Sequence, residues 1–62
     1  MNNIKALRIQ SNLTQEDLAL KLNISRSTVS MWETGESLPR SSKLQELAKI
    51  LNCSIDELFK MK

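Results

Sequence analysis

The sequence predicts an all-α domain of five short helices, and two observations carry that prediction. First, apolar side chains recur at helical spacing along most of the 62 residues, while signals for strands are weak, with one tryptophan, one phenylalanine and no tyrosine. Second, one junction pattern occurs three times, as Asn12-Leu13-Thr14, Asn23-Ile24-Ser25 and Asn52-Cys53-Ser54. A chain this short forms at most one domain, so we expect residues 1–62 to be a single unit.

The junction pattern predicts where one helix ends and the next begins. Asparagine tolerates the left-handed conformation that ends a helix. The Ser or Thr two residues later can cap the next helix, and the apolar residue between them can pack as a hydrophobic staple. Ser54 with Glu57, and Ser42 with Gln45, also fit the capping-box pattern. We therefore expect three similar corners between helices.

The five expected helices follow one another along the chain. Their expected bounds are residues 3–11, 15–22, 26–34, 43–51 and 55–60. The residues expected to face the core in the first four are Ile4, Leu7 and Arg8; Leu18, Ala19 and Leu22; Val29, Trp32 and Glu33; and Leu44, Leu47, Ala48 and Leu51. Gly35 suits a left-handed helix terminus, and Pro39 prevents the third helix from continuing into the fourth.

Composition excludes several classes of function. Nine Lys and Arg against seven Asp and Glu give a formal charge of +2, which is too mild to indicate a partner. One cysteine and no histidine argue against a disulfide framework and a zinc site, and no Gly-rich phosphate loop or carboxylate pair suggests an enzyme. We expect no cofactor, no metal and no small-molecule ligand. Without a long apolar run or a signal peptide, we expect a cytoplasmic protein with no membrane contact.

Residues 14–35 carry the functional signal. The turn between Leu18 and Ile24 is too short for antiparallel packing, so the two helices must cross steeply. Ala19 is small where they approach, and Asn23 turns the corner. This spacing is typical of a helix-turn-helix, although it also fits any compact helical bundle. The second of the two helices presents a small face suited to the major groove of DNA, formed by Arg26, Ser27, Ser30 and Met31.

The chain resembles the phage-repressor/Cro-type (XRE) helix-turn-helix family in two stretches, LTQEDLA at residues 13–19 and ISRSTVSMWETG at residues 24–35. The similarity extends over essentially the whole chain. It implies a compact five-helix, lambda-repressor-like domain that binds operator DNA as a dimer, with its third helix in the major groove. We therefore expect a sequence-specific transcriptional regulator, a repressor on a pseudo-palindromic operator. The alternative is an antitoxin or other protein-interaction module with the same fold.

The base-facing residues each have an alternative interpretation. Arg26 can span O6 and N7 of guanine, or it can hold a phosphate instead. The Ser27 hydroxyl can read a donor or an acceptor, and Ser30 lies on the same face. Met31 would be explained by contact with a thymine methyl group, or by a partly buried position at the edge of the face.

The resemblance also implies contacts with the DNA backbone. Gln15 matches a family position that binds a phosphate, whereas its alternative is a solvated glutamine at a helix start. The remaining backbone contacts would come from two threonines of the third helix and from the start of the fourth helix, whose free N–H groups attract phosphate. These residues are Thr28, Thr34, Arg40, Ser41, Ser42 and Lys43. Plain helix capping by the two serines is compatible with that role.

Two further expectations concern the frame of the domain. Matching family positions imply an ion pair between Arg8 and Glu33 that joins the first helix to the third. Near the C-terminus, more apolar residues crowd together than a domain this small can bury, so we expect a two-fold contact with a second chain. A toxin partner is the alternative occupant of that surface. The residues concerned are Ile55, Leu58, Phe59 and Met61.

Overall fold

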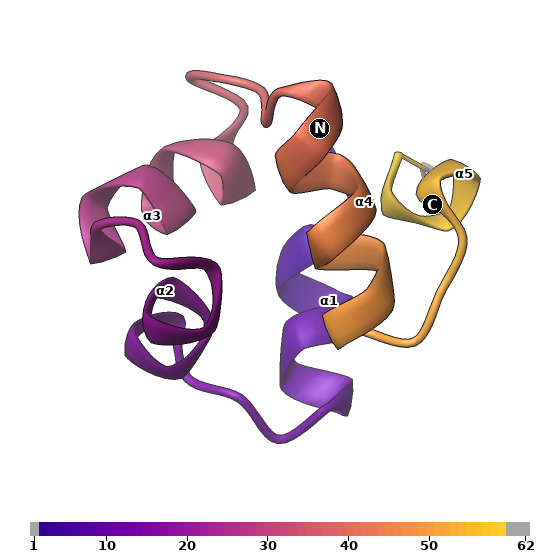
Figure 1. Cartoon of the computed structure of the whole chain (residues 1–62), viewed down its shortest axis with the longest axis horizontal. Coiled ribbons are helices and arrows are strands. Elements are labelled where there is room, and N and C mark those ends of the chain that lie inside the picture. The colour runs from indigo at the N-terminus through magenta and orange to yellow at the C-terminus, as the bar shows by residue number, and fades with distance from the viewer. Residues whose placement is uncertain (1, 60–62) are drawn as a thin grey trace.

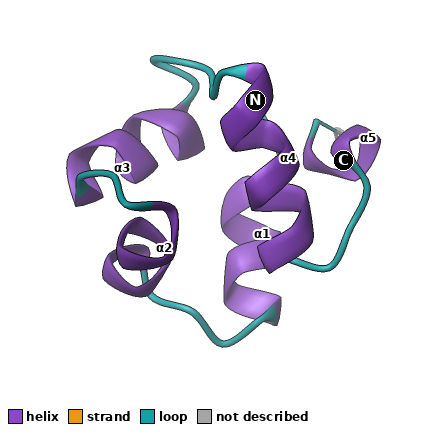
Figure 2. Cartoon of the chain, in the orientation of Figure 1, coloured by secondary structure: helices purple, strands orange, loops and turns teal. Residues whose placement is uncertain are grey.

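The structure is a computed structural model that describes residues 2–59, and this range contains five α-helices and no strand. The helices are α1 (Ile4–Gln10), α2 (Gln15–Leu22), α3 (Arg26–Thr34), α4 (Ser41–Ile50) and α5 (Ile55–Leu58). The longest connection is the loop from α3 to α4, and the other three are short turns (Figure 2). None of these helices has the length and apolar character needed to cross a bilayer. The predicted all-α, five-helix fold is confirmed.

The five helices are arranged so that α2 and α3 lie on one side of the molecule and α5 on the opposite side (Figure 1). Between them lie α1 and α4. The closest pair is α2 with α3, while α1 packs against α3 and α4 packs against both α2 and α5. The helix-turn-helix pair therefore rests on a support formed by α1 and α4.

The three junctions have the conformation that the sequence predicts. Asn12, Asn23 and Asn52 all adopt the left-handed conformation, with φ of 60°, 57° and 54°. The hydroxyls that follow them cap the next helix by accepting backbone hydrogen bonds: Thr14 from Asp17 at 3.0 Å, Ser25 from Thr28 at 3.2 Å and Ser54 from Glu57 at 3.2 Å. The carboxylates of Asp17 and Glu57 in turn accept from the backbone N–H groups of Thr14 and Ser54, which completes two capping boxes. The corners are thus specified by local sequence, as predicted.

The start of α4 differs from the prediction. The helix begins at Ser41 rather than Lys43, and its N-cap is Arg40, whose side chain makes no capping hydrogen bond. The Arg40 carbonyl accepts the first helical bond from Leu44 N–H at 2.8 Å. Ser42 is therefore already the second helical residue, so its predicted capping box with Gln45 is wrong. At the other end of the chain, α5 ends at Leu58, and the predicted end at Lys60 lies outside the described residues.

The hydrophobic core takes residues from all five helices. Trp32 is only 4% exposed and packs α3 against the core, and Leu58 of α5 belongs to the same cluster. The buried apolar residues are Ile4, Leu7, Leu18, Ala19, Leu22, Val29, Trp32, Leu47, Leu51 and Leu58. Most of the core is therefore the set that helical spacing predicts, with the predicted Leu44 and Ala48 only half-buried at its edge.

Two asparagines before α1 tie distant elements together. The Asn2 amide donates to the Trp32 carbonyl in the last turn of α3 at 2.7 Å, and its oxygen accepts from Ile4 N–H at 3.1 Å. The backbone N–H of Asn3 donates to the Leu58 carbonyl at the end of α5 at 2.8 Å. Nothing in the sequence pattern predicted these links, because their partners are backbone carbonyls 30 and 55 residues away.

Candidate DNA-binding surface

One side of α3 is buried and the other is open to solvent, as is required of a helix that contacts base edges in a DNA groove. Val29 and Trp32 are buried in the core. On the opposite side, Arg26 and Ser27 are exposed, Ser30 is half-buried and Met31 is 37% exposed. The four residues predicted to face bases therefore lie together on the outer side of α3, with Met31 close to the margin of the exposed face. We call this set of four residues the reading face.

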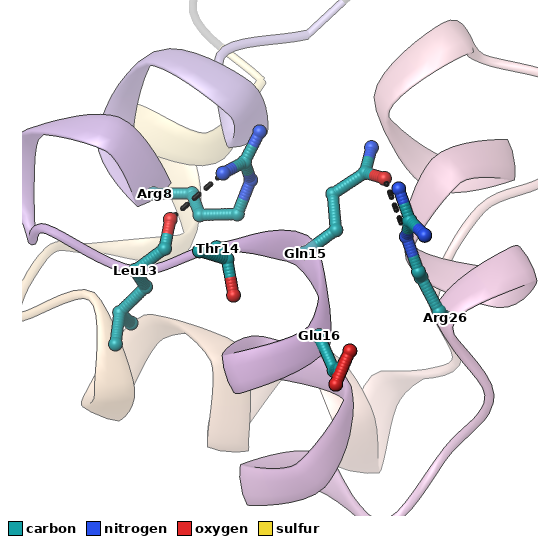
Figure 3. A pocket seen from close by; sticks show the side chains of 6 residues that line it. All are labelled: Arg8, Leu13, Thr14, Gln15, Glu16 and Arg26. Carbon is teal, nitrogen blue, oxygen red and sulfur yellow. Dashed lines mark hydrogen bonds between the residues drawn. The ribbon is translucent and has the colours of Figure 1, made fainter.

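The amino-terminal ends of α2 and α3 meet beside the reading face. Gln15, the first residue of α2, accepts a hydrogen bond at 3.4 Å through Oε1 from Nε of Arg26, the first residue of α3 (Figure 3). A hollow of about 250 Å³ is lined by Gln15, Arg26, Ser27 and Ser30. Free N–H groups and the positive ends of the helix dipoles lie at this corner and attract anions, whereas the carboxylates of Glu16 and Asp17 in the first turn of α2 oppose that attraction.

A buried network supports this corner from behind. Arg8 of α1 donates through Nε to Oε2 of Glu33 at 2.6 Å, and through Nη1 to the Leu13 carbonyl at 2.7 Å. The Glu33 carboxylate also accepts from Nε2 of Gln15 at 2.9 Å. The side chains of Arg8 and Glu33 are only 9% and 4% exposed. The structure thus brings the predicted ion-pair residues together and connects them, through Gln15, to Arg26.

A second and larger hollow lies next to the network. Its volume is about 470 Å³, and Figure 3 shows Gln15 and Arg26 side by side in its lining, joined by their hydrogen bond. Its lining residues are Arg8, Leu13, Thr14, Gln15, Glu16 and Arg26. Arg8 is already bonded to Glu33 and Leu13, so Arg26 is the cation in this lining that remains available for a ligand. The exposed carboxylate of Glu16 carries the opposite charge.

The cap of α2 contributes a fixed negative charge close to this corner. The backbone N–H of Thr14 donates to the Asp17 carboxylate at 3.0 Å. That bond, together with the Thr14 hydroxyl, lowers the pKa of Asp17 below its ordinary value. Asp17 is therefore ionised at neutral pH, and its charge complements the positive end of the α2 dipole.

The residues predicted to contact the DNA backbone differ in how available they are. Arg40, Ser41 and Ser42 are exposed at the start of α4. The Thr28 hydroxyl is paired with that of Ser25 at 2.8 Å, and the Thr34 hydroxyl lies 3.2 Å from both the Met31 carbonyl and Glu36. Those two hydroxyls already have partners, so α4 offers the more accessible groups.

Lys43 has a position that the sequence did not indicate. Its Nζ donates to the Leu22 carbonyl at 2.7 Å and lies 3.3 Å from the Glu46 carboxylate. Its side chain is only 30% exposed. The ammonium group is thus turned toward the end of α2. No sequence signal could reveal this contact, because its acceptor is a backbone carbonyl.

The C-terminal apolar cluster is smaller than predicted. Leu58 has no exposed surface, so its expected place in a contact with a second chain is corrected: it belongs to the core of its own chain. Ile55 is 40% exposed and Phe59 is half-buried, which leaves these two for such a contact. Met61 lies outside the described residues. The single turn of α5 separates the two roles, since Ile55 and Leu58 lie at its two ends.

Comparison with known proteins gives a consistent result. The sequence model of a helix-turn-helix family matches residues 4–58. The chain is 42% identical over 56 residues to an HTH-type transcriptional activator, BcrR of Enterococcus faecalis, covering 90% of this chain and 28% of that protein. It is 40% identical over 58 residues to an uncharacterised HTH-type transcriptional regulator of Methanocaldococcus jannaschii, covering 94% of this chain and 88% of that one. A 26 kDa repressor protein of Escherichia phage HK022 is 43% identical over 37 residues, covering 60% of this chain and 16% of the repressor.

Proposed function

The chain belongs to the helix-turn-helix family of DNA-binding transcriptional regulators, and from that membership we propose that it binds a pseudo-palindromic operator as a homodimer and represses transcription. Its place in this family makes it a regulator and not an enzyme. The observation that carries the proposal is the reading face on α3, which is open to solvent while Val29 and Trp32 hold the opposite side of the helix in the core.

Base reading is assigned to three side chains of the reading face. Arg26 extends from the first turn of α3 and can donate two hydrogen bonds to a guanine, a contact that discriminates by about 1–3 kcal/mol. Ser27 is exposed beside it and supplies a donor and an acceptor. Met31 offers an apolar surface for a thymine methyl group. Ser30 is half-buried between them and has the weakest access.

Phosphate binding is assigned to both flanks of the reading face. On one flank, Gln15 is held by Glu33 and lies at the free N–H groups of α2. On the other flank, the start of α4 offers the exposed side chains of Arg40, Ser41 and Ser42. Thr28 can donate to a phosphate while its hydroxyl accepts from Ser25, whereas the Thr34 hydroxyl would have to turn away from the Met31 carbonyl and Glu36. Two phosphate sites on either side of a reading helix would fix its depth and angle in the groove.

A homodimer explains how so small a reading face could select a site. Three side chains read only a few base pairs, and two copies related by a two-fold axis double that number. Ile55 is 40% exposed and Phe59 is half-buried, so both can contribute to such a contact, and α5 lies on the side of the molecule opposite α2 and α3 (Figure 1). The two reading helices would then enter successive major grooves, about 34 Å apart.

Repression needs no surface beyond the one that binds DNA. One relative is named as an activator and another as a repressor, so likeness to these relatives does not set the direction of regulation. A protein bound across a promoter blocks RNA polymerase by its volume alone. Occlusion is therefore the mechanism that requires the fewest further contacts, and for a regulator of this kind we propose the cytoplasm, where the DNA is.

Selection of binding sites from random duplex DNA tests this proposal. We expect an inverted repeat whose half-site centres are roughly one helical turn apart. Sedimentation of the complex should give two chains per selected duplex. Binding without sequence preference, with an affinity set by salt concentration alone, would reduce the protein to a nonspecific DNA binder. A selected site occupied by a single chain would overturn the homodimer.

A further inference from the structure

Lys43 connects two elements that lie far apart in sequence. Its Nζ donates to the carbonyl of Leu22, the last residue of α2, at 2.7 Å. The last four carbonyls of a helix have no partner within the helix, so this bond satisfies an acceptor that would otherwise need water. The positive charge also lies at the negative end of the α2 dipole, which is a favourable position for a cation.

This contact lies where it can fix the position of α4 relative to the corner between α2 and α3. Leu22 immediately precedes Asn23, the left-handed residue that turns the chain from α2 into α3. Lys43 itself lies in the first turn of α4, beside Arg40, Ser41 and Ser42. The lysine thus joins the corner of the helix-turn-helix to the end of α4 that faces outward with exposed polar groups.

We propose that Lys43 is a positioning residue, which holds the phosphate-binding start of α4 at a fixed distance from the reading helix and does not itself neutralise a phosphate. The proposal rests on the proposed function and refines the assignment of its contacts. The Lys43 side chain is 30% exposed, and its ammonium group has the Leu22 carbonyl and the Glu46 carboxylate as present partners. These two partners leave at most one ammonium N–H for a phosphate. Arg40, three residues earlier, is exposed and is the cation available for that contact.

The salt dependence of DNA affinity separates a positioning lysine from a phosphate ligand. Each phosphate neutralised by a side chain adds about 0.9 to the slope of log K against log salt. We would measure this slope on the selected duplex for wild type, Lys43→Met, Lys43→Arg and Arg40→Met. Arg40→Met should lower the slope by roughly one. Lys43→Met should leave the slope unchanged and weaken binding about three- to tenfold, and Lys43→Arg, which keeps a donor for Leu22, should restore the affinity.

Two outcomes of that series would overturn the proposal. If Lys43→Met lowers the slope as much as Arg40→Met, the lysine is a phosphate ligand. If Lys43→Met changes neither slope nor affinity, the lysine has no part in DNA binding. Failure of the wild type to bind any duplex would instead contradict the proposed function, and it would leave the contact itself to be tested separately.

Nuclear magnetic resonance of the ammonium group provides that separate test on the wild-type chain. A hydrogen-bonded, partly covered Lys43 should give a proton–nitrogen signal that is protected from exchange in the free protein. The signal is assigned by its absence in Lys43→Arg, and it should not shift when the duplex is added. An unprotected signal, or a large shift on DNA binding, would overturn the proposal even if Lys43→Met does not fold.

Discussion

Gln15 Nε2 donates to Glu33 Oε1 at 2.9 Å, which joins the first residue of α2 to the last turn of α3. A carboxylate only accepts hydrogen bonds, so the amide nitrogen of Gln15 must face Glu33 and its oxygen must face the other way. That oxygen is turned toward Nε of Arg26, 3.4 Å away. Because Glu33 is itself held by Arg8, the orientation of the Gln15 amide is set from the core outward.

Replacing Gln15 with leucine should weaken DNA binding more than folding. The variant keeps the size of the side chain but loses the link to Glu33 and the contact with Arg26. We expect the affinity for the selected duplex to fall about tenfold, equivalent to roughly 1.4 kcal/mol, with a smaller loss in the free energy of unfolding. Gln45→Leu, at an exposed position in α4, is the matched control. Equal affinities for the two variants would remove Gln15 from the binding surface.

Replacing Arg8 with methionine should destabilise the domain strongly. The substitution leaves the Glu33 carboxylate, only 4% exposed, without its cation. Loss of one partner from a buried pair costs about 3–5 kcal/mol, whereas an apolar replacement of both partners is often nearly neutral. The double variant Arg8→Met/Glu33→Leu should therefore recover most of the stability in urea unfolding. Recovery should not extend to DNA affinity, since Gln15 then lacks its acceptor. Additive effects on stability would show that the two charges do not act as a pair.

The conformation of Asn23 predicts different outcomes for two small substitutions. Its φ of 57° costs a residue with a Cβ about 1–2 kcal/mol, and glycine avoids that cost. Asn23→Ala should lower the free energy of unfolding by about 1 kcal/mol, while Asn23→Gly should change it by a few tenths. Thermal or urea unfolding measures both, with Lys21→Ala in the preceding helix as a control. A tolerated alanine would mean that the corner is not held in this conformation.

Acid should remove the stabilisation that Asp17 gives to α2. Its pKa is lower in the folded chain, so the unfolded chain binds more protons as the pH falls. The contribution is therefore complete at neutral pH and is lost as the pH falls below about 3.9, the ordinary value, toward the folded one. Asp17→Asn should melt below wild type at neutral pH, with a difference that vanishes in acid. Asp56→Asn, outside the capping pair of α5, is the control. A difference that persists in acid would contradict the assignment.

The sequence predicts those features of the structure that depend on local side chains, and it does not predict those that depend on contacts between distant residues. The bounds of α2 and α3 follow from sequence because each helix has a hydroxyl cap at its start and a left-handed Asn or Gly at its end. The start of α4 does not, since Arg40 caps it without a side-chain bond. Sequence spacing also cannot tell that Leu58 is buried in its own chain, or that Lys43 and Asn2 donate to distant carbonyls.

The central claim is that α3 reads base edges, and the specificity of Arg26→Ala tests it most directly. Sites would be selected from random duplex DNA by this variant and by wild type in parallel, at the same salt concentration. The account predicts that one base pair in each half-site loses its preference, by about 1–3 kcal/mol, while the other positions remain unchanged. An unchanged motif that is bound uniformly more weakly would contradict it, because Arg26 would then hold only a phosphate.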